Sequence, residues 1–180
     1  FKYGLLAALT KQGCNSGGCH GAPSGKGGFR LSLRAFDPVL DVETLIREEL
    51  GRRTNVVDPG ESLLLSKPLM RVAHGGGQQL LPGDPAWRLI RDWIAQGCRP
   101  DPADQPRCVR TEVFPKERVL VFPAVSQQVR VLAHFSDGRV RDITHLAVYS
   151  SSDETIAEID RGGRITASAG GQVGILVRYL

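Results

Sequence analysis

The sequence predicts two domains: a mainly α-helical domain over residues 1–105, followed by an all-β sandwich over residues 108–180. The first observation is the spacing of apolar residues, which is helical in the first half and alternating, with many β-branched residues, in the second. The second observation is the segment RPDPADQPR at 99–107, whose three prolines are typical of an interdomain linker. A chain of 180 residues is long enough for two compact units.

Four stretches of the first domain have the apolar spacing and end signals of short helices. They cover residues 1–10, 41–50, 59–65 and 85–96. Asp41 and Asp84 are the expected caps of the second and fourth helices, because an aspartate accepts hydrogen bonds from the free N–H groups of a first turn. Gly51 and Gly97 are the expected ends of these two helices. The expected buried stripe of the last helix is Leu89, Ile90, Trp93 and Ile94.

Seven short alternating runs follow the linker and are predicted to be β-strands. They cover residues 111–114, 129–135, 140–143, 147–150, 156–159, 164–167 and 174–179. Turn-forming residues separate several of them, as in SDG at 136–138 and RGG at 161–163. Seven short strands with turns between them predict a small β-sandwich.

The glycine-rich segment 13–28 contains a pattern that predicts covalently bound haem. Cys14 and Cys19 supply two thiols that can add to the haem vinyl groups, and His20, next to the second cysteine, can bind the iron. The usual spacing places two residues between the cysteines, whereas this chain has four. Gly17 and Gly18 lie in this longer loop, so we expect it to bulge outward while both sulfurs reach one haem edge.

Two other interpretations of the same residues remain open. Cys14 and Cys19 could form a local disulfide, with His20 as a bystander, or Cys14, Cys19, His20 and His74 could bind zinc. Neither explains how a loop-rich domain with few aromatic residues obtains its apolar core. A large apolar cofactor would supply that core.

The residues alone leave the sixth iron ligand open among three possibilities. Met70 is the only methionine of the chain, and its thioether can bind iron. His74 follows closely and precedes three glycines, which would let the backbone lie near the porphyrin plane. The third possibility is an open sixth position. If His74 is the ligand, we expect Met70 to be a packing residue.

Several runs of the first half resemble the cytochrome-c-like modules of large planctomycete proteins. These runs are GCNSGGCHG, GKGGFRLSLRAFDP, DPGESLLLSKP, HGGG and LIRDWIAQG. The resemblance implies a cytochrome c fold in which the first and last helices cross, with Gly4 and Trp93 as the candidates for the crossing point. Because the HGGG element recurs in such modules, it also implies His74 as the sixth ligand. The cofactor would then be haem c, bound by Cys14, Cys19, His20 and His74, with His20 and His74 as the metal ligands.

The second half resembles a bacterial Ig-like domain of group 2, which commonly follows such modules. The runs that carry this resemblance are SDGRVRDIT, YSSSDETIAEID and GGRITASAGGQVGILVRY. Such domains act as spacers, stiffeners or adhesive surfaces. The resemblance therefore implies an Ig-like sandwich over residues 108–180 without chemistry of its own.

Composition narrows the classes of partner and compartment. The formal net charge of +4 comes from 23 Lys and Arg against 19 Asp and Glu, without a block of like charges, and gives no support for nucleic acid binding. No apolar stretch is long enough for a membrane span. An even number of cysteines suits an extracytoplasmic location, as covalent haem does. Cys98 and Cys108 flank the linker and are either a disulfide or two free thiols.

These observations lead us to expect a single-haem c-type module that transfers electrons within a larger extracytoplasmic protein, periplasmic or at the cell surface. Its partners would be a redox protein or other domains of the parent chain. We expect an electron carrier rather than an enzyme. The alternatives are a peroxidase-like or gas-binding haem domain with an open sixth position, and a cell-surface adhesion or scaffold fragment.

Overall fold

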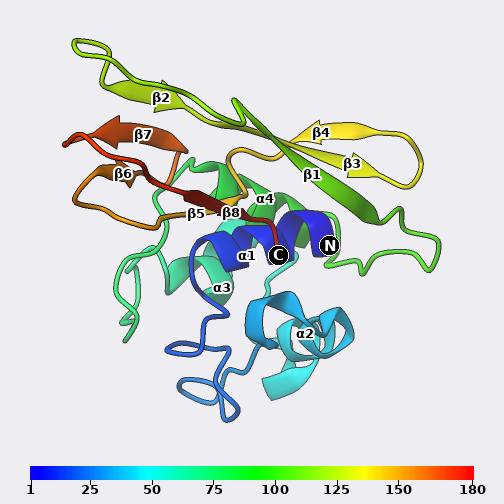
Figure 1. The fold of residues 1–180 in the computed structure, drawn as a ribbon. Helices are drawn as coiled ribbons and strands as arrows, with labels where there is room; N and C mark the ends of the chain where they lie inside the picture. The colour runs from blue at the N-terminus through cyan, green and yellow to red at the C-terminus, as the bar shows by residue number, and fades with distance from the viewer. The chain divides into compact units, whose positions relative to one another are not determined.

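The computed structural model describes residues 1–180 and divides into two compact units, Phe1–Ala103 and Asp104–Tyr179 (Figure 1). The division falls inside the proline-rich segment 99–107. Proline lacks the backbone N–H that helices and sheets require, so neither kind of element continues through this segment.

Short helical segments joined by long loops form the first unit (Figure 1). In chain order they are η1 (Lys2–Leu6), α1 (Ala7–Lys11), η2 (Leu33–Ala35), α2 (Pro38–Ile46), η3 (Glu48–Gly51), η4 (Pro59–Glu61), α3 (Leu63–Ser66) and α4 (Pro85–Ala95). The prediction of helices near residues 1–10 and 85–96 is confirmed. The predicted helix over 59–65 is divided, because Ser62 between η4 and α3 has an extended backbone.

The core of the first unit forms where α4 packs against η1, α1 and α3. Trp93 on α4 lies against Phe1, with ring centres 5.5 Å apart. Of the stripe predicted for α4, Ile90, Trp93 and Ile94 are buried, whereas Leu89 is partly exposed. Other large side chains of this core with almost no exposure are Leu6, Leu31, Leu45, Leu65 and Leu80.

Gly4 does not mark a close approach of two helices. A Cβ atom added at Gly4 would meet no other atom within 4 Å. Its predicted role, a small residue facing Trp93 at a helix crossing, is therefore wrong, because close packing would leave no room for that Cβ.

The start of α2 also differs from the prediction. Asp37 is its cap and accepts hydrogen bonds from the N–H groups of Val39 and Leu40, each at 3.1 Å. Asp41, the predicted cap, lies within the helix and is fully buried. The helix begins earlier than expected because Pro38, with its fixed φ and missing N–H, suits a first helical position.

Eight short strands form the second unit. They are β1 (Cys108–Phe114), β2 (Ser126–Gln128), β3 (Arg130–Phe135), β4 (Val140–Asp142), β5 (Val148–Ser151), β6 (Ala157–Ile159), β7 (Arg164–Ala167) and β8 (Ile175–Arg178). Each of the seven predicted runs overlaps one of them, and β2 is additional. On β3 the alternate residues Val131, Ala133 and Phe135 are buried, as expected for a strand with one face in the core.

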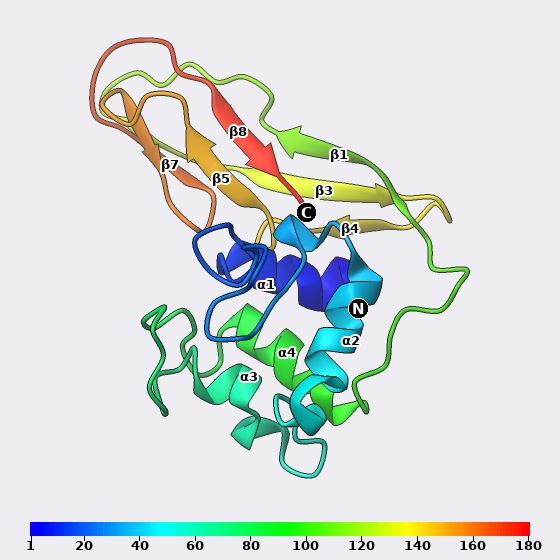
Figure 2. The ribbon, with the colours of Figure 1, turned by 90° about the horizontal axis from the view of Figure 1, so that it is seen from below.

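All strand pairs in the second unit are antiparallel. One sheet has the order β1-β3-β4, a second has the order β2-β7-β6, and β5 pairs with β8 alone. Figure 2 shows β8 beside β5. The shortest strands have only three residues, so the β2–β7, β3–β4 and β6–β7 pairs each match only three residues, whereas β1 and β3 match six.

The predicted fold class, a mainly α cytochrome c fold followed by an all-β Ig-like sandwich, is wrong. The chain is 24% helical and 20% strand, with its strands in small antiparallel sheets. Even the longest helix, α4, has only 11 residues, because glycine and proline interrupt helices. The strands form three small sheets, whereas a sandwich consists of two larger sheets packed face to face. None of the helices has the length and apolar character needed to cross a lipid bilayer.

Candidate haem site

The first helix leads directly into the cysteine-containing loop. Beyond α1, Gly13 has φ +76°, a left-handed conformation that glycine adopts without strain, and it turns the chain. The Cys14 N–H still donates to the carbonyl oxygen of Leu9 at 2.9 Å. Cys14 therefore continues the hydrogen bonding of α1, a helix in which Ala7, Ala8, Leu9 and Thr10 are all buried.

The loop between the cysteines closes on itself. The His20 N–H donates to the Cys14 carbonyl oxygen at 3.0 Å, which brings the two ends of the motif together despite the longer spacing. Ser16, Gly17 and Gly18 are exposed, whereas Asn15 is buried. The extra residues thus bulge outward, as the glycines predicted.

His20 is held by the segment that follows it. Its Nδ1 lies 2.9 Å from the carbonyl oxygen of Phe29, and its own carbonyl accepts from the Leu31 N–H at 2.7 Å. A carbonyl can only accept, so Nδ1 is the donor in this hydrogen bond. Burial lowers the pKa of His20, although the hydrogen bond to Phe29 opposes this effect. A neutral imidazole with an oriented ring is the form that binds a metal.

His74 has the same arrangement on a different loop. It lies after α3, is partly buried, and places Nδ1 2.8 Å from the carbonyl oxygen of Gly77. The Gly77 N–H donates back to the His74 carbonyl at 3.0 Å. Nδ1 is again the donor, because the carbonyl oxygen of Gly77 can only accept.

The fold brings these two histidines together from distant parts of the sequence. Their ring centres are 6.3 Å apart and the ring planes differ by 17°. Lys26 bridges the two loops through its Nζ, which lies 3.4 Å from the carbonyl oxygen of Gly75. The two rings are stacked and nearly parallel, so the fold places both imidazoles where one cofactor could contact them.

The thiols of Cys14 and Cys19 are free in the structure. Burial, followed by the nearby charge of Cys19, raises the pKa of Cys14 to about 12. The Cys14 thiol is therefore protonated at neutral pH. The structure contains no disulfide between these two residues, which was one alternative interpretation of the motif.

The zinc alternative has no geometric support. No group of three or more His, Cys, Asp or Glu side chains is placed so that it could hold a metal ion. Two imidazoles alone do not complete a tetrahedral zinc site. A porphyrin brings four nitrogen ligands of its own, so the pair of His20 and His74 would be sufficient for haem iron.

Met70 is not the core residue that we predicted. It lies in the loop after α3, its side chain is 48% exposed, and its backbone has φ +60°. The prediction was wrong because a lone methionine among leucines gives no local sign of which way the loop turns. Its exposure leaves its thioether accessible.

Sequence reasoning missed the residues that support His20. Phe29 accepts the Nδ1 hydrogen bond, and its ring centre lies 4.4 Å from that of His20. The guanidinium of Arg53 lies 4.7 Å above the Phe29 ring and donates to the Thr44 carbonyl at 2.7 Å. Arg53 is buried and so helps to fix Phe29. A basic residue just after a helix gave no signal of this role.

A cavity of about 610 Å³ is lined in part by residues of the motif loop. Its lining includes Gly17, Gly21, Leu31, Phe36 and Leu40, but not His20. It is therefore distinct from the space between the two imidazoles. Phe36 at its edge is 89% exposed.

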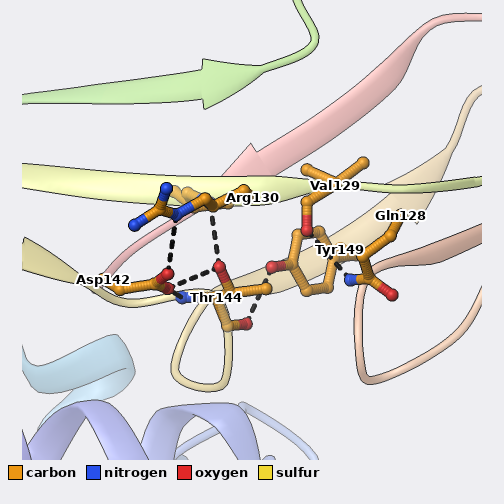
Figure 3. Close-up of polar contacts among 7 residues, drawn as sticks. Gln128, Val129, Arg130, Asp142, Thr144 and Tyr149 are labelled. Atoms are coloured by element: carbon orange, nitrogen blue, oxygen red, sulfur yellow. Dashed lines mark hydrogen bonds and ion pairs between the residues drawn. The ribbon is translucent and has the colours of Figure 1, made fainter.

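The second unit contains polar contacts that stabilise its turns (Figure 3). Asp142 accepts from Arg130 at 2.9 Å and from the Thr144 hydroxyl at 2.7 Å. The Tyr149 hydroxyl donates to the Thr144 carbonyl, also at 2.7 Å. These bonds connect β3, β4, β5 and the turn between β4 and β5, and they bring together no nucleophile with a base.

The remaining two cysteines lie in different units. Cys98 is buried, and Cys108 is partly buried at the start of β1. Burial raises the pKa of both thiols. Both are free in the structure, and a disulfide between them stays a prediction.

No model of a known protein family matches this sequence, and a search of curated proteins finds nothing similar to it. The resemblance to cytochrome-c-like modules and to group 2 Ig-like domains is therefore without support from these comparisons. The candidate haem site rests on the motif and on its geometry.

Proposed function

We propose that the first unit binds one haem covalently through Cys14 and Cys19, uses His20 and His74 as axial iron ligands, and transfers single electrons. The observation that carries this proposal is the pair of nearly parallel imidazoles 6.3 Å apart, each with Nδ1 bonded to a backbone carbonyl.

Each residue of the site has a distinct task in this proposal. Cys14 and Cys19 hold the cofactor by thioether bonds at one edge. His20 is kept in place by Phe29, and His74 by Gly77, so that each presents Nε2. When bound, haem supplies a one-electron iron couple. If both His20 and His74 bound the iron, small molecules would have no free site on it, which would favour electron transfer over chemistry on a substrate.

The compartment and the partners follow from the same proposal. Covalent haem is attached outside the cytoplasm, so the chain would be periplasmic or exposed at the cell surface. Its partner would be another redox protein or another domain of a larger parent chain. The second unit would act as a spacer.

The test is to produce the protein in cells with a cytochrome c maturation system. We expect the mass of one haem added to the chain, and a haem that acid acetone does not extract. Cys14→Ala and Cys19→Ala should each leave a single thioether and shift the pyridine haemochrome band. Loss of haem on acid-acetone extraction of the unmutated protein would contradict covalent attachment.

The ligand assignment has its own test. The ferric protein should be low-spin, and His74→Ala should make it high-spin, because one strong axial ligand is lost. Met70→Leu is the matched control and should leave the spectrum unchanged. A sulfur-to-iron charge-transfer band that disappears in Met70→Leu would show that Met70 is the ligand. A high-spin unmutated protein would favour the peroxidase-like or gas-binding alternative with an open position.

A further inference from the structure

The three glycines after His74 have different surroundings. A Cβ atom added at Gly75 would lie 3.8 Å from the Lys26 side chain, an ordinary contact. At Gly77 it would meet nothing within 4 Å, but the backbone φ of +68° disfavours other residues. At Gly76 it would lie 2.9 Å from Cε1 and 3.2 Å from Nε2 of His74.

The imidazole of His74 therefore lies directly over the Cα atom of Gly76. The hydrogen bond from Nδ1 to the Gly77 carbonyl folds the ring back across the turn. Gln79 also holds this turn, since its Nε2 donates to the Gly76 carbonyl at 2.7 Å. The ring and the turn leave no space for a methyl group between them.

We infer that Gly76 is a positioning residue that sets where the His74 imidazole lies relative to His20. This inference rests on the proposed role of His74 as the sixth ligand. Gly76 is not needed for its backbone conformation, because its φ lies outside the left-handed region. Its missing side chain is needed because the His74 ring, with Cε1 nearest, occupies that space.

A methyl group at Gly76 can be accommodated in one way at low energetic cost. The imidazole is the end of a rotatable side chain, so it would turn away while the backbone stays in place. The ring would then lose the hydrogen bond to Gly77 and its position opposite His20. Binding of His74 to iron would weaken, although the histidine itself remains.

The experiment compares Gly76→Ala with Gly75→Ala in the haem-loaded protein. We expect Gly76→Ala to increase the high-spin fraction of the ferric protein and to bind added imidazole at least ~10-fold more tightly, because a displaced His74 competes less for the iron. Saturating imidazole should restore the low-spin spectrum, which shows that the rest of the site is intact. Gly75→Ala should keep the spectrum and imidazole affinity of the unmutated protein.

His74→Ala separates failure of this inference from failure of the proposed function. If His74→Ala becomes high-spin while Gly76→Ala keeps the original spectrum and affinity, the inference about Gly76 is wrong and the ligand assignment stands. Equal effects of Gly75→Ala and Gly76→Ala would also overturn the inference, because the effect would then belong to the whole loop. If His74→Ala itself changes nothing, His74 is not the ligand.

Discussion

Asp41 accepts two hydrogen bonds from Ser32: one from its N–H at 2.6 Å and one from its hydroxyl at 2.7 Å. The carboxylate has no solvent exposure. The Ser32 hydroxyl also accepts from the Asp37 N–H at 2.9 Å. These bonds tie the start of α2 to the segment after Leu31, whose N–H in turn bonds the His20 carbonyl. A buried carboxylate in helix α2 thus supports the loop that carries His20.

This carboxylate should make stability depend on pH. Burial raises the pKa of Asp41, an effect that the bonds from Ser32 only partly offset. A raised pKa in the folded state means that stability is highest below the ordinary value of 3.8 and falls as the pH rises through the folded value. Asp41→Asn cannot ionise. Its unfolding free energy should therefore increase relative to that of the unmutated protein as the pH rises from about 4.

Urea unfolding at a series of pH values measures this difference. Asp92→Asn, at an exposed carboxylate on α4, is the matched control. If the stability curves of Asp41→Asn and the unmutated protein run parallel from about pH 3 to 7, Asp41 does not ionise differently in the folded and unfolded chains.

The number of reactive thiols should report on haem attachment. In the haem-loaded, reduced and denatured protein, we expect only Cys98 and Cys108 to react, because Cys14 and Cys19 would be thioethers. In the folded protein Cys98 should react slowly, since it is buried and its pKa is raised by burial. Titration with a chromogenic disulfide measures both. In the control, Cys108→Ser, Cys98 should be the one remaining reactive thiol. Four reactive thiols in the unmutated protein would contradict covalent attachment.

Without reductant, the same titration tests the predicted disulfide between Cys98 and Cys108. Its formation would leave no reactive thiol in the haem-loaded, denatured protein. Two reactive thiols under these conditions would show that the disulfide does not form.

Tyr149 should stabilise the second unit through its hydroxyl. Tyr149→Phe removes the hydrogen bond to the Thr144 carbonyl and should cost about 1 kcal/mol of unfolding free energy. Burial, with the charges of Asp142 and Asp160, raises the pKa of Tyr149 to about 12. Because the pKa of Tyr149 is raised in the folded protein, the stability that this residue contributes is present below its ordinary pKa of 10. That stability is lost as the pH rises towards 12.

Ultraviolet titration of tyrosinate measures this ionisation directly. One of the three tyrosines should ionise late in the folded protein, and this late step should be absent in Tyr149→Phe. A late step that persists in Tyr149→Phe would assign the raised pKa to another tyrosine.

The second unit should fold without the first. Residues 104–179 bury their own apolar side chains, among them Val131, Ala133, Ile143 and Ala157. Expressed alone, they should unfold cooperatively with a β-sheet circular dichroism spectrum. The matched measurement is the same transition in the full chain, which should occur at a similar denaturant concentration. A disordered fragment would mean that its fold requires the first unit.

Local features could be predicted from the sequence because their causes lie within a few residues. Proline at the start and glycine after the end limit the helix near 85–96, and the alternation of apolar and polar residues predicts the strands. The outward bulge of the loop between Cys14 and Cys19 follows from its two glycines. In each case the backbone preference of neighbouring residues is sufficient.

Only the tertiary structure decided which distant residues meet. The fold class was wrong because sheet order depends on long-range strand pairing, which local pattern does not specify. The sequence predicts Asp41 as a helix cap, but packing places it in the interior with Ser32. The approach of His74 to His20 depends on two loops that packing brings side by side, and no property of either sequence segment alone determines that distance.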